Sequence, residues 1–290
     1  MPSTATTSTS TSSSTSKATA TATATSTSVA RERRPTRTRS ADTLGLPAAL
    51  RSEWIKISTV RTYTVLLGLT VLSGLVTSWA TGTFVKDEVL FAREVFLYST
   101  VLTSVFASIT GILLLTSEAQ HGTLTGVLTS QPARWVIVVA KSCVAAAAGL
   151  GFGVLGMAAG FGGSLLAGLD VGDTSALPRI IAWSLVFTTA SGVLGVGLGM
   201  IARNSAAAIS GLLVWSLVVE NLLREFLNAS VARFLPFNAG NGLLSIPATN
   251  DTAARKAVQL SSIENAFVFG GFTAVAIAIG TLLLYRRDTN

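Results

Sequence analysis

Long apolar stretches alternate with short polar segments along most of this chain. Six stretches of about 18–25 residues carry almost no charge, and a helix of that length crosses about 30 Å of hydrocarbon. Uninterrupted helices satisfy their own backbone hydrogen bonds, which lipid cannot do. The pattern therefore predicts an all-α, multi-pass membrane protein with six transmembrane helices at residues 64–84, 95–115, 142–168, 180–201, 205–223 and 264–284.

The centres of these stretches contain no Asp, Glu, Lys, Arg or His, and ionisable residues such as Glu118, Glu220 and Glu264 lie near their ends. Ionisable side chains at mid-membrane are costly and are typical of transporters coupled to ion gradients. Their absence from the centres counts against proton or sodium coupling. Two alternative functions stay open. One is an ion-gradient-driven secondary transporter, which this absence disfavours, and the other is a membrane anchor or scaffold without transport.

Composition supports the same class of protein. Hydrophobic residues make up 49% of the chain and charged residues only 12%, against about 25% charged residues in soluble globular proteins. These polar side chains are too few to cover the surface of a soluble protein. The single cysteine, Cys143, excludes an internal disulfide bond.

The distribution of basic residues predicts the orientation in the cell membrane, because Lys and Arg in short loops resist transfer across the bilayer. They are concentrated before the first span and after the second, fourth and sixth. The residues assigned to the cytoplasmic side are Arg31, Arg33, Arg34, Arg37, Arg39, Arg51, Lys56, Arg61, Arg134, Lys141, Arg203, Arg286 and Arg287. We therefore expect both termini in the cytoplasm. The net charge of +7 then reflects topology and anionic membrane lipids, not nucleic-acid binding.

The chain divides into three regions of different character. Residues 1–45 are rich in Ser, Thr and Ala, end in a basic run and lack the apolar core of a signal peptide, so we expect a disordered tail. Residues 46–62 form an amphipathic segment, and residues 63–290 hold the six predicted spans.

The amphipathic segment is predicted to be an elbow helix that lies in the plane of the lipid headgroups. Leu50, Trp54 and Ile57 recur at helical spacing on its expected apolar face. The polar residues assigned to the other side are Arg51, Glu53, Lys56 and Arg61.

A polar segment, Ser117–Lys141, connects the second and third spans on the cytoplasmic side. Glu118 and His121 are expected just past the membrane, and Pro132 precedes an interfacial pair, Arg134 and Trp135. An exposed segment of this kind suits the docking of a soluble partner. An ordinary connection that covers the helix ends fits the pattern equally well.

Three stretches of sequence carry a resemblance to a known family. "LRSEWIKISTVRTYTV" enters the first span, and "SEAQHGTL" followed by "QPARWVIVVAK" lies between the second and third spans. Residues 46–290 resemble the ABC type-2 permeases, the membrane subunits of bacterial ATP-binding-cassette exporters. The positions that match the family pattern are Glu118, Gly122, Thr123, Pro132, Arg134 and Lys141.

The resemblance implies six spans per subunit, two permease subunits per transporter, as a homodimer or heterodimer, and a separate cytoplasmic ATPase. This ATPase is expected to dock after the second span, on a coupling segment. The residues of that segment are Glu118, His121, Gly122, Thr123, Leu124, Pro132 and Arg134. The chain is thus interpreted as the permease subunit of an exporter of unidentified substrate.

The sequence indicates no enzyme activity in the chain itself. It contains no GxxxxGK[ST] loop, which an ATPase of this kind needs to hold phosphate. His121 is the only histidine and has no Cys, Asp or second His beside it. We therefore expect no catalytic, cofactor or metal site, and ATP hydrolysis in a partner subunit.

Small and hydroxylated residues indicate how the helices pack. Gly149 and Gly153, Gly156 and Gly160, and Gly195 and Gly199 form three small-residue faces that are typical of close helix contacts. Hydroxyl side chains on the first two spans fit either a substrate pathway or ordinary hydrogen bonds between helices. The candidates for pathway lining are Ser73, Thr77, Thr103 and Ser104.

The region after the fifth span, residues 220–262, is too long for a tight turn and contains many Leu and Phe residues among polar ones. We expect an extracytoplasmic helical segment that partly re-enters the interface and ends near Pro236. Two roles fit this segment, an outer gate and a plain structural cap.

Overall fold

The computed structural model describes residues 45–85, 90–120, 134–244 and 257–287, and all regular structure within them is helical. Six helices are long and apolar enough to cross a membrane, as predicted. Five of them are α2 (Arg61–Phe84), α3 (Ala92–Gln120), α5 (Arg134–Leu166), α6 (Leu177–Ala202) and α12 (Ser262–Arg287). The fifth span is a continuous run of α7 (Ser205–Val214), the π-helical turn η1 (Trp215–Val219) and α8 (Glu220–Phe226).

Short helices accompany the spans within the described ranges. The elbow segment forms α1 (Leu46–Thr59), with Pro47 in its first turn. Beyond the fifth span lie α9 (Ala229–Ala232) and α10 (Pro236–Leu243). The expected helical segment after the fifth span is therefore present, but Pro236 begins a helix there instead of ending one. Proline suits a first turn because its missing N–H would have no helical partner there.

The second and third spans extend further than predicted. The 29 residues of α3 measure about 44 Å at 1.5 Å per residue, well beyond about 30 Å of hydrocarbon. The third span begins at Arg134, eight positions before the predicted residue 142. Both extensions contain a charged residue, Glu118 and Lys141 respectively, and each charge has partners that are described below.

A tight turn reverses the chain between the fourth and fifth spans. Arg203 ends α6 in the left-handed conformation, with φ 53°. Asn204 then caps α7, because its side chain accepts a hydrogen bond from the backbone N–H of Ala207 at 3.0 Å. The two spans consequently run antiparallel.

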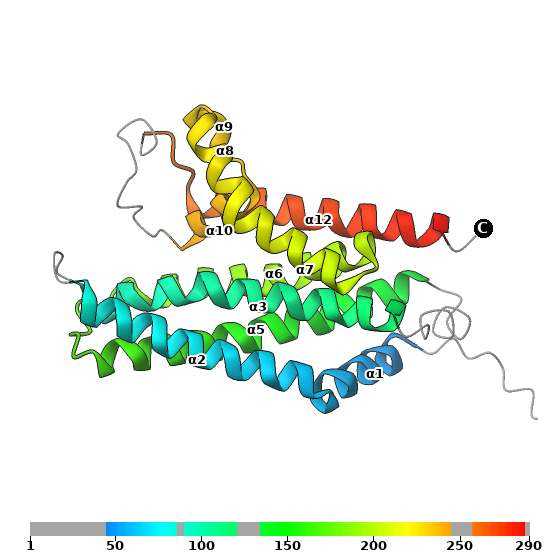
Figure 1. The fold of residues 1–290 in the computed structure, drawn as a ribbon, viewed down its shortest axis with the longest axis horizontal. Coiled ribbons are helices and arrows are strands. Elements are labelled where there is room, and N and C mark those ends of the chain that lie inside the picture. Colours follow the sequence, from blue (N-terminus) through cyan, green and yellow to red (C-terminus); the bar gives the residue numbers. More distant parts are fainter. Residues whose placement is uncertain (1–44, 86–89, 121–133, 245–256, 288–290) are drawn as a thin grey trace, which may run out of the picture. The chain divides into compact units, whose positions relative to one another are not determined.

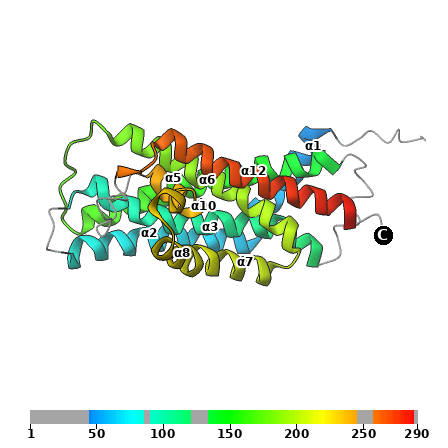
Figure 2. The same cartoon turned by 90° about the horizontal axis from the view of Figure 1, so that it is seen from above.

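The second span, α3, lies at the centre of the helix bundle and contacts α2, α5, α6 and α7 (Figures 1 and 2). Within the most apolar 18 residues of each span, 72% of the residues of α3 are buried, but only 17% of those of the first span and 17% of those of the fifth. The faces of the first and fifth spans that lack a neighbour in this chain are thus available to lipid or another subunit.

The predicted small-residue faces are confirmed as helix contacts. A Cβ added to Gly195 on α6 would lie 2.0 Å from the carbonyl oxygen of Ser108 on α3. A Cβ at Gly156 on α5 would lie 2.4 Å from Oγ1 of Thr103 on α3. Since no side chain tolerates such distances, glycine permits the close approach of α3 to both helices.

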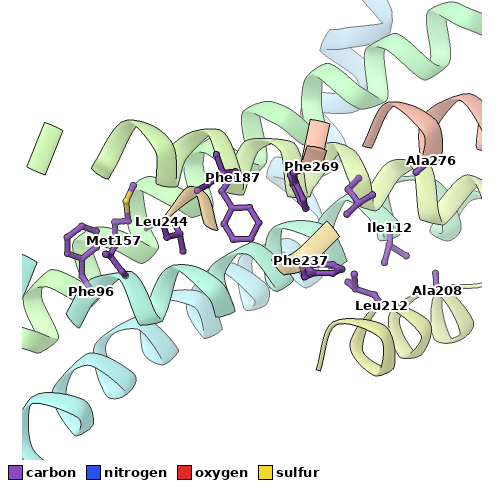
Figure 3. Close-up of a cluster of buried hydrophobic side chains, with 13 residues drawn as sticks. Phe96, Ile112, Met157, Phe187, Ala208, Leu212, Phe237, Leu244, Phe269 and Ala276 are labelled. Atoms are coloured by element: carbon purple, nitrogen blue, oxygen red, sulfur yellow. The ribbon is translucent and has the colours of Figure 1, made fainter. Parts of the chain in front are cut away.

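Aromatic side chains attach α10 to the bundle. The rings of Phe187 on α6 and Phe269 on α12 meet edge to face, with centroids 5.2 Å apart. Phe237 on α10 contacts Phe269 in the same way at 6.3 Å, and the three rings point toward one another (Figure 3). Edge-to-face pairs are favourable beyond the area that they bury, so this cluster positions α10 between the fourth and sixth spans.

Glu220 joins the fifth span to α10. This buried carboxylate accepts hydrogen bonds from the backbone N–H groups of Phe237, at 3.1 Å, and Asn238. These N–H groups belong to the first turn of α10 and have no partner within that helix. The carboxylate therefore caps α10 and offsets its own burial.

The helix contacts predict opposite effects for two glycines of α5. Gly149→Ala is expected to destabilise the protein by about 1–3 kcal/mol, because the new Cβ would lie 2.5 Å from the carbonyl oxygen of Thr188. Gly151→Ala is the matched control, since nothing lies within 4 Å of its added Cβ, and it should gain about 0.5–1 kcal/mol from helix propensity. Unfolding in mixed micelles measures both changes. Equal effects would contradict the proposed contact.

Candidate functional site

Four charged side chains from three helices meet at one end of the bundle. Glu53 and Lys56 come from α1, Glu118 from α3 and Lys141 from α5. We call this group the charge ring, because each lysine pairs with both glutamates. Its two positive and two negative charges balance.

The geometry of the charge ring is closed. Lys141 Nζ lies 3.0 Å from Glu53 Oε2 and 2.9 Å from Glu118 Oε2. Lys56 Nζ pairs with the other oxygen of each glutamate, at 2.7 Å for Glu53 Oε1 and 2.5 Å for Glu118 Oε1. Lys141 Nζ also donates to the carbonyl oxygen of Leu114 at 2.9 Å. Lys141 thus donates hydrogen bonds to Glu53 and to Leu114 and forms an ion pair with Glu118.

Burial makes these pairs energetically important. Lys141 is 0% exposed, Glu53 4% and Glu118 7%. Removing one member of a buried ion pair leaves the other charge unpaired, which typically costs about 3–5 kcal/mol. The charge ring therefore restrains α1, α3 and α5 to a single relative arrangement.

Lys56 lies at the outer edge of the charge ring, with 38% of its side chain exposed. Burial by itself lowers the pKa of Lys56, but hydrogen bonds to Glu118 and Glu53 outweigh it and raise the pKa above the ordinary value of 10.5. Because its pKa is raised, the contribution of Lys56 to stability is complete below pH 10.5. It is lost only as the pH rises through the pKa that Lys56 has in the folded state. Lys56 is thus protonated at physiological pH.

An apolar cluster lies beside the charge ring. Tyr63 on α2 and Leu114 and Leu115 on α3 are buried in one cluster, against which Leu50 and Ile57 of α1 pack. Apolar surroundings of this kind lower the local dielectric constant and strengthen neighbouring ion pairs.

The predicted faces of the elbow helix require a correction. Leu50 and Ile57 lie on one face, as predicted, and pack against the helix bundle, but Glu53 lies on the same face and is buried, while Trp54 is 52% exposed. Glu53 follows Leu50 by three residues and precedes Ile57 by four, so helical geometry places all three together. The spacing in the sequence was therefore enough to place Glu53 on the same face as Leu50 and Ile57. Lys141 supplies the opposite charge that makes burial of Glu53 favourable.

Most of the predicted coupling segment lies outside the described residues. These positions are His121, Gly122, Thr123, Leu124 and Pro132. Two coupling residues flank the gap: Glu118 lies within the last turn of α3, facing inward, and Arg134 begins α5. The charge ring therefore includes a residue from each helix that adjoins residues 121–133.

The candidate pathway residues do not form one group. Thr103 and Ser104 are buried in α3, and their hydroxyls donate to carbonyl oxygens of that helix at 3.0 and 2.7 Å. Ser73 and Thr77 are only partly buried, on α2. The contacts of Thr103 and Ser104 favour a packing role, and a pathway role for the α2 pair stays a prediction.

Metal-binding clusters are not found in the part of the chain that the structure describes, where no group of three His, Cys, Asp or Glu side chains is close enough to hold an ion. The two glutamates of the charge ring each face two lysines. Lysine ammonium groups occupy the positions where a cation would bind. The charge ring is therefore suited to joining α1, α3 and α5.

Comparison with protein-family models identifies the family of this chain. The family model described as "ABC-2 family transporter protein" matches residues 3–289, nearly the whole chain. A search of curated proteins found no match.

Loss of one charge should destabilise the charge ring strongly. Lys141→Met is expected to lower the free energy of unfolding by about 3–5 kcal/mol, because two buried carboxylates would then share one partly exposed lysine. Arg51→Met, at an exposed position on α1, is the control and should change it by less than about 0.5 kcal/mol. Tryptophan fluorescence during unfolding in mixed micelles measures both. Combining Lys141→Met with Glu53→Gln should cost less than the sum of the single changes, and strict additivity would refute the pairing.

Proposed function

We propose that this chain, which belongs to the ABC-2 transporter family, is the membrane-spanning permease subunit of an ATP-binding-cassette exporter. Its six apolar helices make it a multi-pass membrane protein. The sequence contains no phosphate-binding GxxxxGK[ST] loop, so a separate cytoplasmic ATPase would provide the energy. The substrate would cross the cell membrane on the permease.

The charge ring is the observation that carries this proposal. Residues 121–133 join α3 to α5, and the ring holds both helices to α1 close to that junction. Force applied by a docked ATPase would therefore reach three helices at once, because separating their buried charges is costly. This arrangement supports the assignment of Glu118 to Arg134 as the coupling segment.

The orientation follows from the basic residues of the sequence. We place both termini and the charge ring on the cytoplasmic side, and the turn around Asp173 on the outside. Trp54 and Ile55 are exposed on α1, at 52% and 48%, which suits a helix in contact with lipid headgroups. The division into a tail of residues 1–45, an elbow of residues 46–62 and a transmembrane domain of residues 63–290 belongs to the same proposal.

A second permease subunit, identical or similar, would complete the transporter. The central helix α3 contacts α2 on one side and α7 on the other, so the first, second and fifth spans are neighbours (Figures 1 and 2). Exposed apolar side chains on this part of the molecule include Leu72, Val76 and Leu217. We propose that this face meets the second subunit, with Ser73 and Thr77 near the pathway between them.

Docking on the coupling segment is tested by co-purification with the ATPase. Gly122→Pro and Leu124→Asp should lower the amount of bound ATPase at least fivefold and leave the permease level in the membrane unchanged. Thr174→Asp, in the exposed turn before α6, should bind the ATPase normally. Undiminished binding by both coupling variants would exclude this segment as the docking site.

The orientation is tested with single cysteines in a Cys143→Ser background. Thr174→Cys should react with a membrane-impermeant maleimide in intact cells, because its turn is assigned to the outside. Arg51→Cys, exposed on α1, should react only after the cells are permeabilised. The opposite pattern would reverse the topology.

A further inference from the structure

A polar pocket of about 260 Å³ lies where α8, α9 and α10 approach the start of α12. These elements gather at the end of α12 that is remote from the C-terminus (Figure 1). Tyr98, near the beginning of α3, also lines the pocket. This end of the bundle is opposite to the charge ring, and it faces outward in the proposed topology.

Two arginines, Arg224 from α8 and Arg233 from the turn after α9, line the pocket. Among the described residues that line it, none is Asp or Glu. The described part of the lining therefore has a net positive charge, which would attract an anion. An anion of modest size fits the volume.

Arg233 is held in place but incompletely paired. Its guanidinium lies over the ring of Phe234, at 4.8 Å from the centroid, and donates to the carbonyl oxygen of Val258 at 3.3 Å. Its Nε is buried and has no hydrogen-bond partner within the described residues. No carboxylate of the described residues lies within 4.0 Å of it, since the charged pairs found there do not include Arg233.

The nearby acids are already committed to other groups. Glu220 accepts from the backbone of Phe237 and Asn238. Glu264, which interacts with Arg233 only weakly at longer range, accepts from the backbone N–H and hydroxyl of Ser261. Neither carboxylate is among the described residues that line the pocket, although Glu220 also interacts electrostatically with Arg224.

An unpartnered acceptor lies beside the arginines. Oδ1 of Asn241 is buried and has no hydrogen-bond partner among the described residues. The described lining has three further amide side chains. Asn238 donates to the carbonyl oxygen of Ala232 and Asn265 donates to that of Leu260, and the third amide is that of Gln259. A buried acceptor without a partner costs free energy, and a hydroxyl on the ligand would satisfy it.

We propose that this pocket binds a phosphate group that carries a neighbouring hydroxyl, as in a glycerol phosphate. The guanidinium groups pair with the phosphate oxygens, which arginine suits by its planar array of donors, and the hydroxyl donates to Asn241. Either a phospholipid headgroup at the outer surface or a soluble phosphate ester carries this chemistry.

Binding to the purified, delipidated full chain tests the proposal without the ATPase. Native mass spectrometry measures binding of short-chain phosphatidylglycerol and phosphatidylcholine, and calorimetry measures binding of glycerol 1-phosphate. Phosphatidylglycerol should bind at least tenfold more tightly than phosphatidylcholine. Glycerol 1-phosphate binding would identify a site for soluble esters, whereas binding of the lipid alone would identify a headgroup site.

Substitutions assign the binding to this pocket. Arg233→Gln and Arg224→Gln should each weaken phosphatidylglycerol binding at least fivefold, and Arg233→Lys should lose less. Arg179→Gln, at an exposed position near the start of α6, is the control and should bind as the unmodified protein does. Thermal unfolding identifies any variant that is misfolded. If one of the two arginine-to-glutamine variants is misfolded, lipid binding by the other one tests the proposal. The proposal is overturned if the folded pocket variants bind phosphatidylglycerol as tightly as Arg179→Gln does.

Discussion

Close approach of α3 to its neighbours is the constraint on which the rest of the structure depends. A Cβ added to Gly111 of α3 would lie 2.0 Å from the carbonyl oxygen of Gly192 on α6, and a Cβ at Gly156 of α5 would lie 2.4 Å from Oγ1 of Thr103. Helices in lipid gain little from the hydrophobic effect, so tight van der Waals packing has to hold them. This packing also sets the register of α3 against α5 and so brings Glu118 to Lys141.

Buried charge then attaches the short helices to the long ones. At one end, Glu53 connects α1 to α5 through Lys141. At the other, Glu220 connects the fifth span to α10 through backbone N–H groups. The two carboxylates are neutralised differently, by ammonium groups in one case and by the first turn of a helix in the other. Both arrangements make a helix outside the spans move with the bundle.

The interior of the subunit is occupied by packing contacts. Ser108 at the centre of α3 donates to a carbonyl oxygen of its own helix and to Ser191 of α6, and Thr103 and Ser104 bond within α3. These hydroxyls already form hydrogen bonds within the helix bundle. A translocation pathway is therefore more compatible with the exposed face of the first and fifth spans, where a second subunit would sit.

The sequence by itself determined the six spans, the helix that precedes the first span and the small-residue faces, because span length, helical period and residue size are local properties of the chain. It also indicated the family, through positions such as Glu118 and Pro132. Only the tertiary structure decided that Glu53 faces inward, that Lys141 is buried and that Pro236 begins a helix. Lys141 and Glu53 are 88 residues apart in the chain, and a charge is buried only where folding provides its partner. Pairing at that distance has no local signature, so it depended on how α1, α3 and α5 pack.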